Sequence, residues 1–199
     1  NGEGLLQGGD FELSGKCGYS PDLSDGIVDR AMFHVDNAYF LPKSRIVGHR
    51  CKTNTVSNTA FRGFGGPQGM LAMEAAMDNL AYAAKIEPLL LRERNFYRPG
   101  FSTTPYQQDV GQIVLPDLVK KLVARSDYWS RRENIKAYNA SGPRWRKGIS
   151  LNPVKFGISF TATHLNQAGA LLHIFTDGSV EVNHGGTEMG QGLYTKVQA

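Results

Sequence analysis

Two glycine-rich stretches carry the residue types that could do chemistry. The first, NTAFRGFGGPQGM at residues 58–70, sets Arg62 and Phe64 among glycines, and the second, HGGTEMGQGLYTK at 184–196, sets Gln191 among small residues. Each runs into a sequence typical of a helix. Glycine lets the backbone approach a ligand closely, and the first N–H groups of a helix attract negative charge. The two stretches therefore suit an anionic cofactor, to which the guanidinium and the amide add side-chain donors.

Neither stretch is a standard nucleotide motif. GFGGPQG departs from GxGxxG because Gln68 stands where the third glycine belongs, and the chain holds no GxxxxGK[ST]. A pair of purely structural turns is the alternative interpretation, which Arg62 and Gln191 weaken.

The composition is that of an ordinary globular protein. The 199 residues are 41% hydrophobic and 20% charged, with a net charge of +4, which permits nucleic-acid binding without requiring it. The chain has no apolar run of 18 residues and no pattern of a secretory signal, so we expect a soluble, cytoplasmic protein. Cys17 and Cys51 lack the spacing of a zinc or iron–sulfur site, and we expect reduced, partly buried thiols.

The pattern around the two stretches predicts an α+β fold, with helices packed on mixed sheets. Helices are expected where apolar residues recur every three or four positions: from 26 to an end at Asn37, 66–85, 87–97 and 115–140. Strands are expected where the pattern alternates: 10–19, 44–55, 147–163 and a hairpin over 169–186. Within the hairpin, Asp177-Gly178 fits a type I′ turn.

Three segments together resemble a known family. DRAMFHVDNAYFLP, TNTVSNTAFRGFGGPQGM and THLNQAGALLHIFTDGSVEVNHGGTEMGQGLYTK are similar to the molybdenum-cofactor part of the xanthine dehydrogenase type within the molybdenum hydroxylase family. The likeness runs from Tyr19 to Ala199 and is weakest over 98–148. It implies a molybdopterin-binding fold of the xanthine dehydrogenase/aldehyde oxidase type. Residues 1–145 would be part of a first molybdopterin-binding subdomain and 146–199 the start of a second, so that the chain would be an internal piece of a longer polypeptide.

The resemblance assigns cofactor residues on both glycine-rich stretches. It implies that Arg62, together with Gly63, lies beside the molybdenum without being a direct ligand. It also implies that Met189, Gly190 and Gln191 contact the molybdopterin, with the main chain of Met189 making its contact.

The resemblance also implies a site for a purine substrate. Phe64 and Phe160 would sandwich the flat heterocycle, Thr161 would hydrogen-bond it, and Arg30 would face its exocyclic oxygen as the catalytic charge. Stacking on aromatic rings contributes roughly 1–3 kcal/mol per base-like ring. Oxidation at a ring carbon pushes negative charge onto the exocyclic oxygen, where a guanidinium stabilises the transition state more than the ground state.

The remaining parts of such an enzyme are expected outside these residues. The resemblance implies a general-base glutamate farther toward the C-terminus, a second substrate-binding glutamate farther toward the N-terminus, and iron–sulfur and FAD domains or subunits. The full enzyme would be a homodimer that oxidises hypoxanthine and xanthine to urate in purine catabolism. The chain alone is expected to be inactive.

Other interpretations stay open. An aldehyde oxidase shares the cofactor loops, although it usually lacks an arginine at the position of Arg30. A nucleic-acid-binding module could be built on residues 128–147, where aromatic and basic side chains interleave, although a solvated helix face followed by a loop is the simpler reading. Without the resemblance, Arg30 would be a surface arginine and Phe64 and Phe160 would be core residues. The five histidines share no ligand spacing and are interpreted as structural or exposed, and no role is assigned to Glu188.

Overall fold

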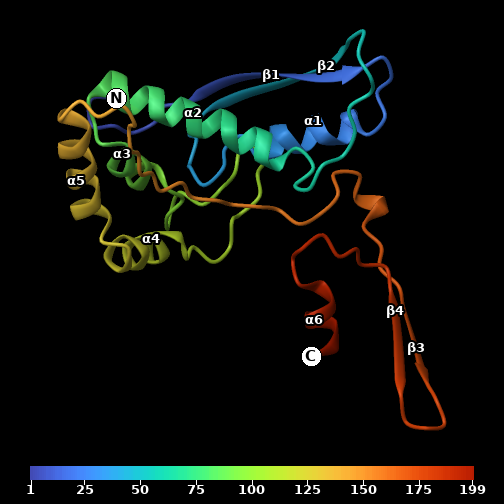
Figure 1. Cartoon of the computed structure of the whole chain (residues 1–199). Helices are drawn as coiled ribbons and strands as arrows, with labels where there is room; N and C mark the ends of the chain where they lie inside the picture. Colours follow the sequence, from blue (N-terminus) through green and yellow to red (C-terminus); the bar gives the residue numbers. More distant parts are fainter. The chain divides into compact units, whose positions relative to one another are not determined.

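A computed structural model describes the whole chain, residues 1–199, which divides into two units, Asn1–Gly157 and Ile158–Ala199. The mixture of helices and sheets confirms the predicted α+β class (Figure 1). The first unit contains β1 (Gly9–Gly18), α1 (Ser24–Phe33), β2 (Ser44–Lys52), α2 (Gly66–Ala84), α3 (Pro88–Asn95), α4 (Leu115–Arg125) and α5 (Tyr128–Ala140). The second contains a short 3₁₀ turn (Thr163–Leu165), β3 (Ala170–Ile174), β4 (Val180–His184) and α6 (Leu193–Gln198). No helix is both long and apolar enough to cross a membrane.

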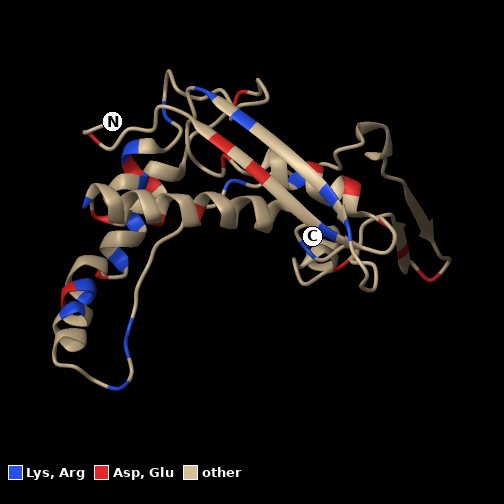
Figure 2. Cartoon of the chain, turned by 90° about the horizontal axis from the view of Figure 1, so that it is seen from above, with Lys and Arg blue, Asp and Glu red and all other residues tan.

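The first unit opens with two parallel strands joined through α1. The strands β1 and β2 pair in register from Gly9 opposite Ser44 to Lys16 opposite Cys51, which confirms the two predicted strands. Acidic side chains gather on β1 and basic ones on β2 (Figure 2), and Arg45 meets Asp10 at 2.9 Å. This exposed pairing favours the observed register.

The long helix α2 carries the core of the first unit. It starts with Pro67 in its first turn, where the missing N–H costs no hydrogen bond, and it buries Met73 and Met77 almost completely. Ala81 of α2 also belongs to this core. The other buried members come from the neighbouring helices and loops: Tyr39, Leu41, Leu89, Leu91, Phe96, Val119 and Tyr128. The predicted helix at 66–85 is confirmed.

Two glycines let α1 and α2 approach at backbone distance. A Cβ atom on Gly65 would lie 1.9 Å from the carbonyl oxygen of Ile27, and one on Gly69 would lie 2.2 Å from that of Ala31. Both distances are far inside van der Waals contact. The glycines of the first stretch thus serve helix packing as well as any ligand.

Two predicted helix bounds are wrong. The helix α1 ends at Phe33 instead of Asn37, and Asn37 itself has a left-handed φ of 43° and a buried side chain that donates to Glu74 at 2.8 Å. The expected helix at 115–140 is two helices, α4 and α5, broken at Asp127, whose φ is 51°. The break turns Tyr128 into the core, where it is 3% exposed, and this burial favours the kink over a continuous helix.

The strand predicted at 147–163 does not form. Residues 149–157, which we call the returning segment, run back along the first unit, and side chains take the place of a neighbouring strand. The backbone N–H of Lys155 donates to Asn37 Oδ1 at 3.2 Å, and the carbonyl oxygen of Pro153 accepts from Asn37 Nδ2 at 2.9 Å. The alternating pattern was therefore a poor guide, because these backbone groups are satisfied by side chains.

The hairpin of the second unit is confirmed, but its turn type is not. The strands β3 and β4 pair antiparallel from Ala170 opposite His184 to Ile174 opposite Val180. Among the turn residues only Gly178 has a positive φ, 85°, whereas a type I′ turn needs two such residues. The bonds Gly178 N–H to Phe175 O and Phe175 N–H to Ser179 O instead define a three-residue loop with a bulge at the glycine.

Candidate functional site

Arg30 is buried on the inner face of α1. The residue is 8% exposed, its guanidinium donates to the carbonyl oxygen of Gly157, and its Cζ lies 4.9 Å from the centre of the Phe156 ring. Burial lowers the pKa of Arg30, yet a guanidinium remains charged at any ordinary pH. The interpretation of Arg30 as a surface arginine is wrong.

Phe156 links Arg30 to the start of α2. Its ring centre lies 5.1 Å from that of His34, and a Cβ atom on Gly66 would lie 2.5 Å from the Phe156 ring. The aromatic ring therefore packs between the arginine-bearing helix and the end of the first glycine-rich stretch. Sequence reasoning missed Phe156, because it sits in a run that looked like a strand.

The first stretch presents its side chains from a left-handed turn. Gly63, Phe64 and Gly65 have φ values of 97°, 48° and 94°. Phe64 N–H donates to Phe61 O at 2.8 Å and Gly66 N–H donates to Gly63 O at 3.0 Å, so two turns follow one another. Phe64 is half-buried, so the interpretation of this residue as part of the core is wrong. A partly exposed ring is compatible with stacking on a ligand.

Arg62 lies in the same turn and is exposed. A positively charged side chain at the start of α2 adds to the positive end of the helix dipole, which favours an anion at this place. The predicted role of Arg62 and Gly63 beside molybdenum stays a prediction.

The second stretch holds itself together through its own side chains. Met189 N–H donates to Gln191 Oε1 at 2.6 Å, and Gln191 Nε2 donates to the carbonyl oxygen of Thr187 at 2.7 Å. Both ends of the Gln191 amide are thus used within the loop. A cofactor contact by Met189 or Gln191, as predicted, would exchange one of these bonds for a bond to the cofactor.

Glu188 organises the same loop. Its carboxylate accepts four backbone N–H groups, from Gly190 at 2.6 Å, Gly192 at 3.2 Å, Leu193 at 2.6 Å and Tyr194 at 3.4 Å. Loss of hydration raises the pKa of Glu188, but the backbone donors outweigh it and leave the pKa below its ordinary value. The Glu188 carboxylate therefore satisfies these four backbone donors and fixes the conformation of the loop.

Phe160 and Thr161 lie at the start of the second unit and are half-buried. The side chain of Asn166 closes their loop, because Phe160 N–H donates to Asn166 Oδ1 at 2.7 Å and Asn166 Nδ2 donates to Phe160 O at 2.9 Å. Since Phe64 belongs to the first unit, the predicted aromatic sandwich stays a prediction.

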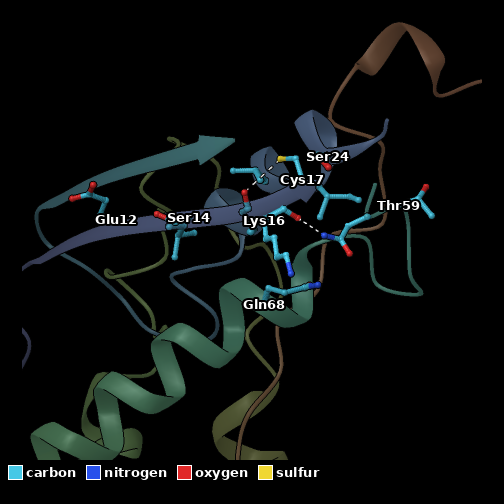
Figure 3. A pocket seen from close by; sticks show the side chains of 13 residues that line it. Glu12, Ser14, Lys16, Cys17, Ser24, Thr59 and Gln68 are labelled. Carbon is cyan, nitrogen blue, oxygen red and sulfur yellow. Dashed lines mark hydrogen bonds between the residues drawn. The ribbon is translucent and has the colours of Figure 1, made fainter. Parts of the chain in front are cut away.

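The chain offers no metal site made of its own side chains, and a cavity lies away from the predicted site residues. No group of three or more His, Cys, Asp or Glu side chains could hold a metal ion. A cavity of about 530 Å³ lies between β1, α1 and Gln68 of α2 (Figure 3). None of the predicted site residues lines it. Cys17, which does, is buried, whereas Cys51 is exposed, and both thiols are free.

The basic segment 128–147 has some of its aromatic and cationic groups engaged within the protein, while others, such as Trp145 at 75% exposed, face solvent. Lys and Arg residues, coloured blue, are prominent on α5 and the loop after it (Figure 2). However, Tyr128 is buried in the core, Lys147 Nζ lies 4.1 Å from the centre of the Tyr138 ring, and Arg132 pairs with Glu87 at 2.6 Å. This arrangement favours a solvated helix face over a stacking surface for nucleic acid.

Comparisons with known proteins identify the family. Family models described as "Molybdopterin cofactor-binding domain" match residues 1–96 and 121–199. The chain is 49% identical over 181 residues to "Xanthine dehydrogenase/oxidase" of Gallus gallus, covering 90% of this chain and 13% of that protein. It is 47% identical over 196 residues to "Xanthine dehydrogenase 1" of Arabidopsis thaliana, covering 98% and 14%. The chain therefore spans about one seventh of the length of these relatives.

Solved structures agree with this chain in fold. The aldehyde oxidoreductase of Desulfovibrio gigas superposes with a TM-score of 0.65 at 26% identity, covering 91% of this chain and 19% of that one. The CO dehydrogenase of Oligotropha carboxidovorans superposes with a TM-score of 0.71 at 20% identity, covering 96% and 26%, and supports the fold alone. The chain belongs to the molybdenum hydroxylase family, is of the xanthine dehydrogenase type, and carries parts of its molybdopterin cofactor-binding domains.

Proposed function

We propose that the chain is part of an oxidoreductase that converts hypoxanthine and xanthine to urate with a water-derived oxygen. Electrons would leave through iron–sulfur and FAD centres outside these residues, in a cytoplasmic homodimer. The observation that carries the purine assignment is Arg30, a buried guanidinium held over Phe156 in a chain whose relatives are named xanthine dehydrogenases. By resemblance, Arg30 takes the position of the arginine that faces the exocyclic oxygen of a purine in this family.

In this proposal the molybdenum–molybdopterin group, when bound, supplies the two-electron oxidation chemistry. The second glycine-rich stretch holds the cofactor through Met189, Gly190 and Gln191, in a loop whose conformation Glu188 fixes by accepting backbone N–H groups. Arg62 and Gly63 approach it from the first stretch. The residues of the chain thereby fix the distance between cofactor and substrate.

Four side chains would handle the substrate. Phe64 and Phe160 exclude water from the faces of the ring, Thr161 donates a hydrogen bond, and Arg30 stabilises the charge that develops on the exocyclic oxygen. A guanidinium offers five donors in one plane. The hydrogen bond from Arg30 to Gly157 O therefore leaves donors for the exocyclic oxygen of the substrate, and it fixes the plane of the guanidinium before the substrate binds.

Arg30→Met in the full-length enzyme tests the proposal. Methionine keeps much of the volume and removes the charge, so xanthine turnover should fall on the order of 10²-fold, mainly in kcat, while a substrate without the exocyclic oxygen loses far less. Steady-state kinetics on both substrates measure this. Equal losses on both would mean that Arg30 supports only the fold or the cofactor.

An aldehyde oxidase is the second candidate, favoured by the structural likeness to the aldehyde oxidoreductase at 26% identity. The same kinetics separate the two functions. Rapid turnover of benzaldehyde-type substrates by the unmodified enzyme, with none of xanthine, would replace the purine assignment by this one.

A further inference from the structure

His34 is a buried histidine that the proposed chemistry does not use. It follows the last residue of α1, is 6% exposed, and lies one helical turn after Arg30. Its ring packs against Phe156, whose face also carries the Arg30 guanidinium. Every group named here lies within the first unit.

The two ring nitrogens of His34 have different partners, and these partners determine the tautomer. Nδ1 lies 2.8 Å from the carbonyl oxygen of Arg30, which can only accept, so Nδ1 carries the hydrogen. Nε2 lies 3.0 Å from the backbone nitrogen of Gly157, which can only donate, so Nε2 is the acceptor. The hydrogen-bond network therefore assigns the neutral Nδ1–H form.

Arg30, His34 and Gly157 form a closed ring of hydrogen bonds. His34 Nδ1–H donates to the Arg30 backbone, Gly157 N–H donates to His34 Nε2, and the Arg30 guanidinium donates to Gly157 O. The two ends of Arg30, backbone and guanidinium, are thus tied to one another through the imidazole and the end of the returning segment. Phe160 and Thr161 follow Gly157 by three and four residues along the chain.

We propose that His34 is a positioning residue, which fixes the Phe156–Gly157 end of the returning segment and thereby the Arg30 guanidinium that faces the substrate. The consequence for a purine rests on the proposed function, but the tie between His34 and Gly157 does not. A displacement of about 1 Å in such a group is enough to cost a large part of the rate.

Protonation would break the tie, because a protonated imidazole has no acceptor for Gly157 N–H. Burial is the largest cause and lowers the pKa of His34 below 6.5, and the nearby charges of Arg30 on α1 and Lys155 in the returning segment act in the same direction. The hydrogen bond to the Arg30 carbonyl oxygen and the charge of Asp36 in the following turn raise the pKa but do not outweigh these causes. The helix α2 presents the uncharged Gly69 to it. The neutral form thus favours the folded state, and this contribution is lost as the pH falls below 6.5 toward the lowered value.

Two substitutions separate the two ring nitrogens. The amide of His34→Gln can place an acceptor where Nε2 was, whereas the shorter amide of His34→Asn reaches only the position of Nδ1. In the full-length enzyme we expect His34→Asn to lower kcat/KM for xanthine on the order of tenfold, with unchanged molybdenum content, and His34→Gln to restore most of it. Equal losses in both variants, or none in either, would overturn the proposal.

Hydrogen exchange supplies a readout that needs no turnover. Peptides that contain Gly157 should be protected in the unmodified protein near neutral pH, should lose protection as His34 protonates, and should show no such pH step in His34→Gln. If protection at Gly157 changes neither with pH nor in His34→Asn, the hydrogen bond to His34 does not hold the returning segment in place. If hydrogen exchange behaves as expected but the enzyme does not turn over xanthine, the tie between His34 and Gly157 is supported and the proposed purine substrate is wrong.

Discussion

The two glycine-rich stretches look alike in sequence and differ in what their glycines do. In the first, Gly65 and Gly69 have no room for a Cβ atom because the backbone of α1 lies against them. In the second, a Cβ atom on Gly192 would meet nothing within 4 Å, and its N–H, like that of Gly190, donates to Glu188. The first stretch needs glycine for packing between helices and the second for backbone conformation and donors. A shared pattern therefore does not imply a shared role.

The largest expected effect comes from Gly65→Ala. The new Cβ atom would lie 1.9 Å from Ile27 O in a residue with a φ of 94°. We expect a loss of roughly 2–5 kcal/mol in the free energy of unfolding, because left-handed strain contributes roughly 1–2 and overpacking roughly 1–3 kcal/mol. Thermal unfolding measures it. A midpoint equal to that of the unmodified protein would show that α1 and α2 do not approach as closely as described.

Arg62→Met removes the positive charge of the first stretch and leaves its glycines unchanged, so it tests the role of the charge alone. Because Arg62 is exposed, we expect a change in unfolding free energy within about 0.5 kcal/mol, whereas activity or molybdenum content should fall, activity on the order of 10²-fold. Arg45→Met, at an exposed arginine of β2, is the matched control. Full metal content and full activity in Arg62→Met would remove Arg62 from the site.

Glu188→Gln tests whether the second stretch depends on its carboxylate. Loss of the charge should weaken the four backbone contacts and speed hydrogen exchange at residues 190–194 several-fold. The pKa of Glu188 is lowered from its ordinary value of 4.5 in the unmodified protein. The protection should therefore be complete above pH 4.5 and be lost as the pH falls through the lowered pKa. Glu181→Gln on β4 serves as the control. Unchanged exchange in Glu188→Gln would show that the loop holds without it.

A smaller loss of stability than in Gly65→Ala is expected from Gly192→Ala. Nothing stands within 4 Å of the added atom, so only the left-handed φ of 76° is strained, at a cost of roughly 1–2 kcal/mol. Local hydrogen exchange and thermal unfolding measure it. A loss as large as that of Gly65→Ala would erase the distinction between the two stretches.

Individual helices and strands could be predicted from the sequence where one strong sequence pattern determined them. The helix α2 has Pro67 at its start and a repeated apolar face, and the hairpin has alternation on both sides of a turn. Periodicity failed where a single residue mattered more, as at Asp127, whose left-handed conformation breaks a helix that the pattern continues. It failed again in the returning segment, whose hydrogen bonds go to side chains about 120 residues away.

The site was predictable only in part. Arg30, Arg62 and Phe64 could be picked out by resemblance, but the burial of Arg30 and its partner Phe156 depend on a contact 126 residues along the chain, which no local pattern encodes. His34 was passed over because the five histidines share no ligand spacing, and Glu188 because the resemblance places the general base elsewhere. Their importance comes from backbone groups that they bind, and backbone groups look the same in every sequence.

The tie between Asn37 and the returning segment also constrains the order in which the protein can form. Asn37 bonds to Pro153 across 116 residues, and Lys155 reaches the buried carboxylate of Asp36 across 119. On a ribosome that adds 5–20 residues per second, these buried polar groups wait roughly 6–24 s for their partners. A nascent chain ending near residue 145 would still lack them. The first unit can therefore close only once residues 153–157 have left the exit tunnel, which makes these few residues the last step in its synthesis-coupled folding.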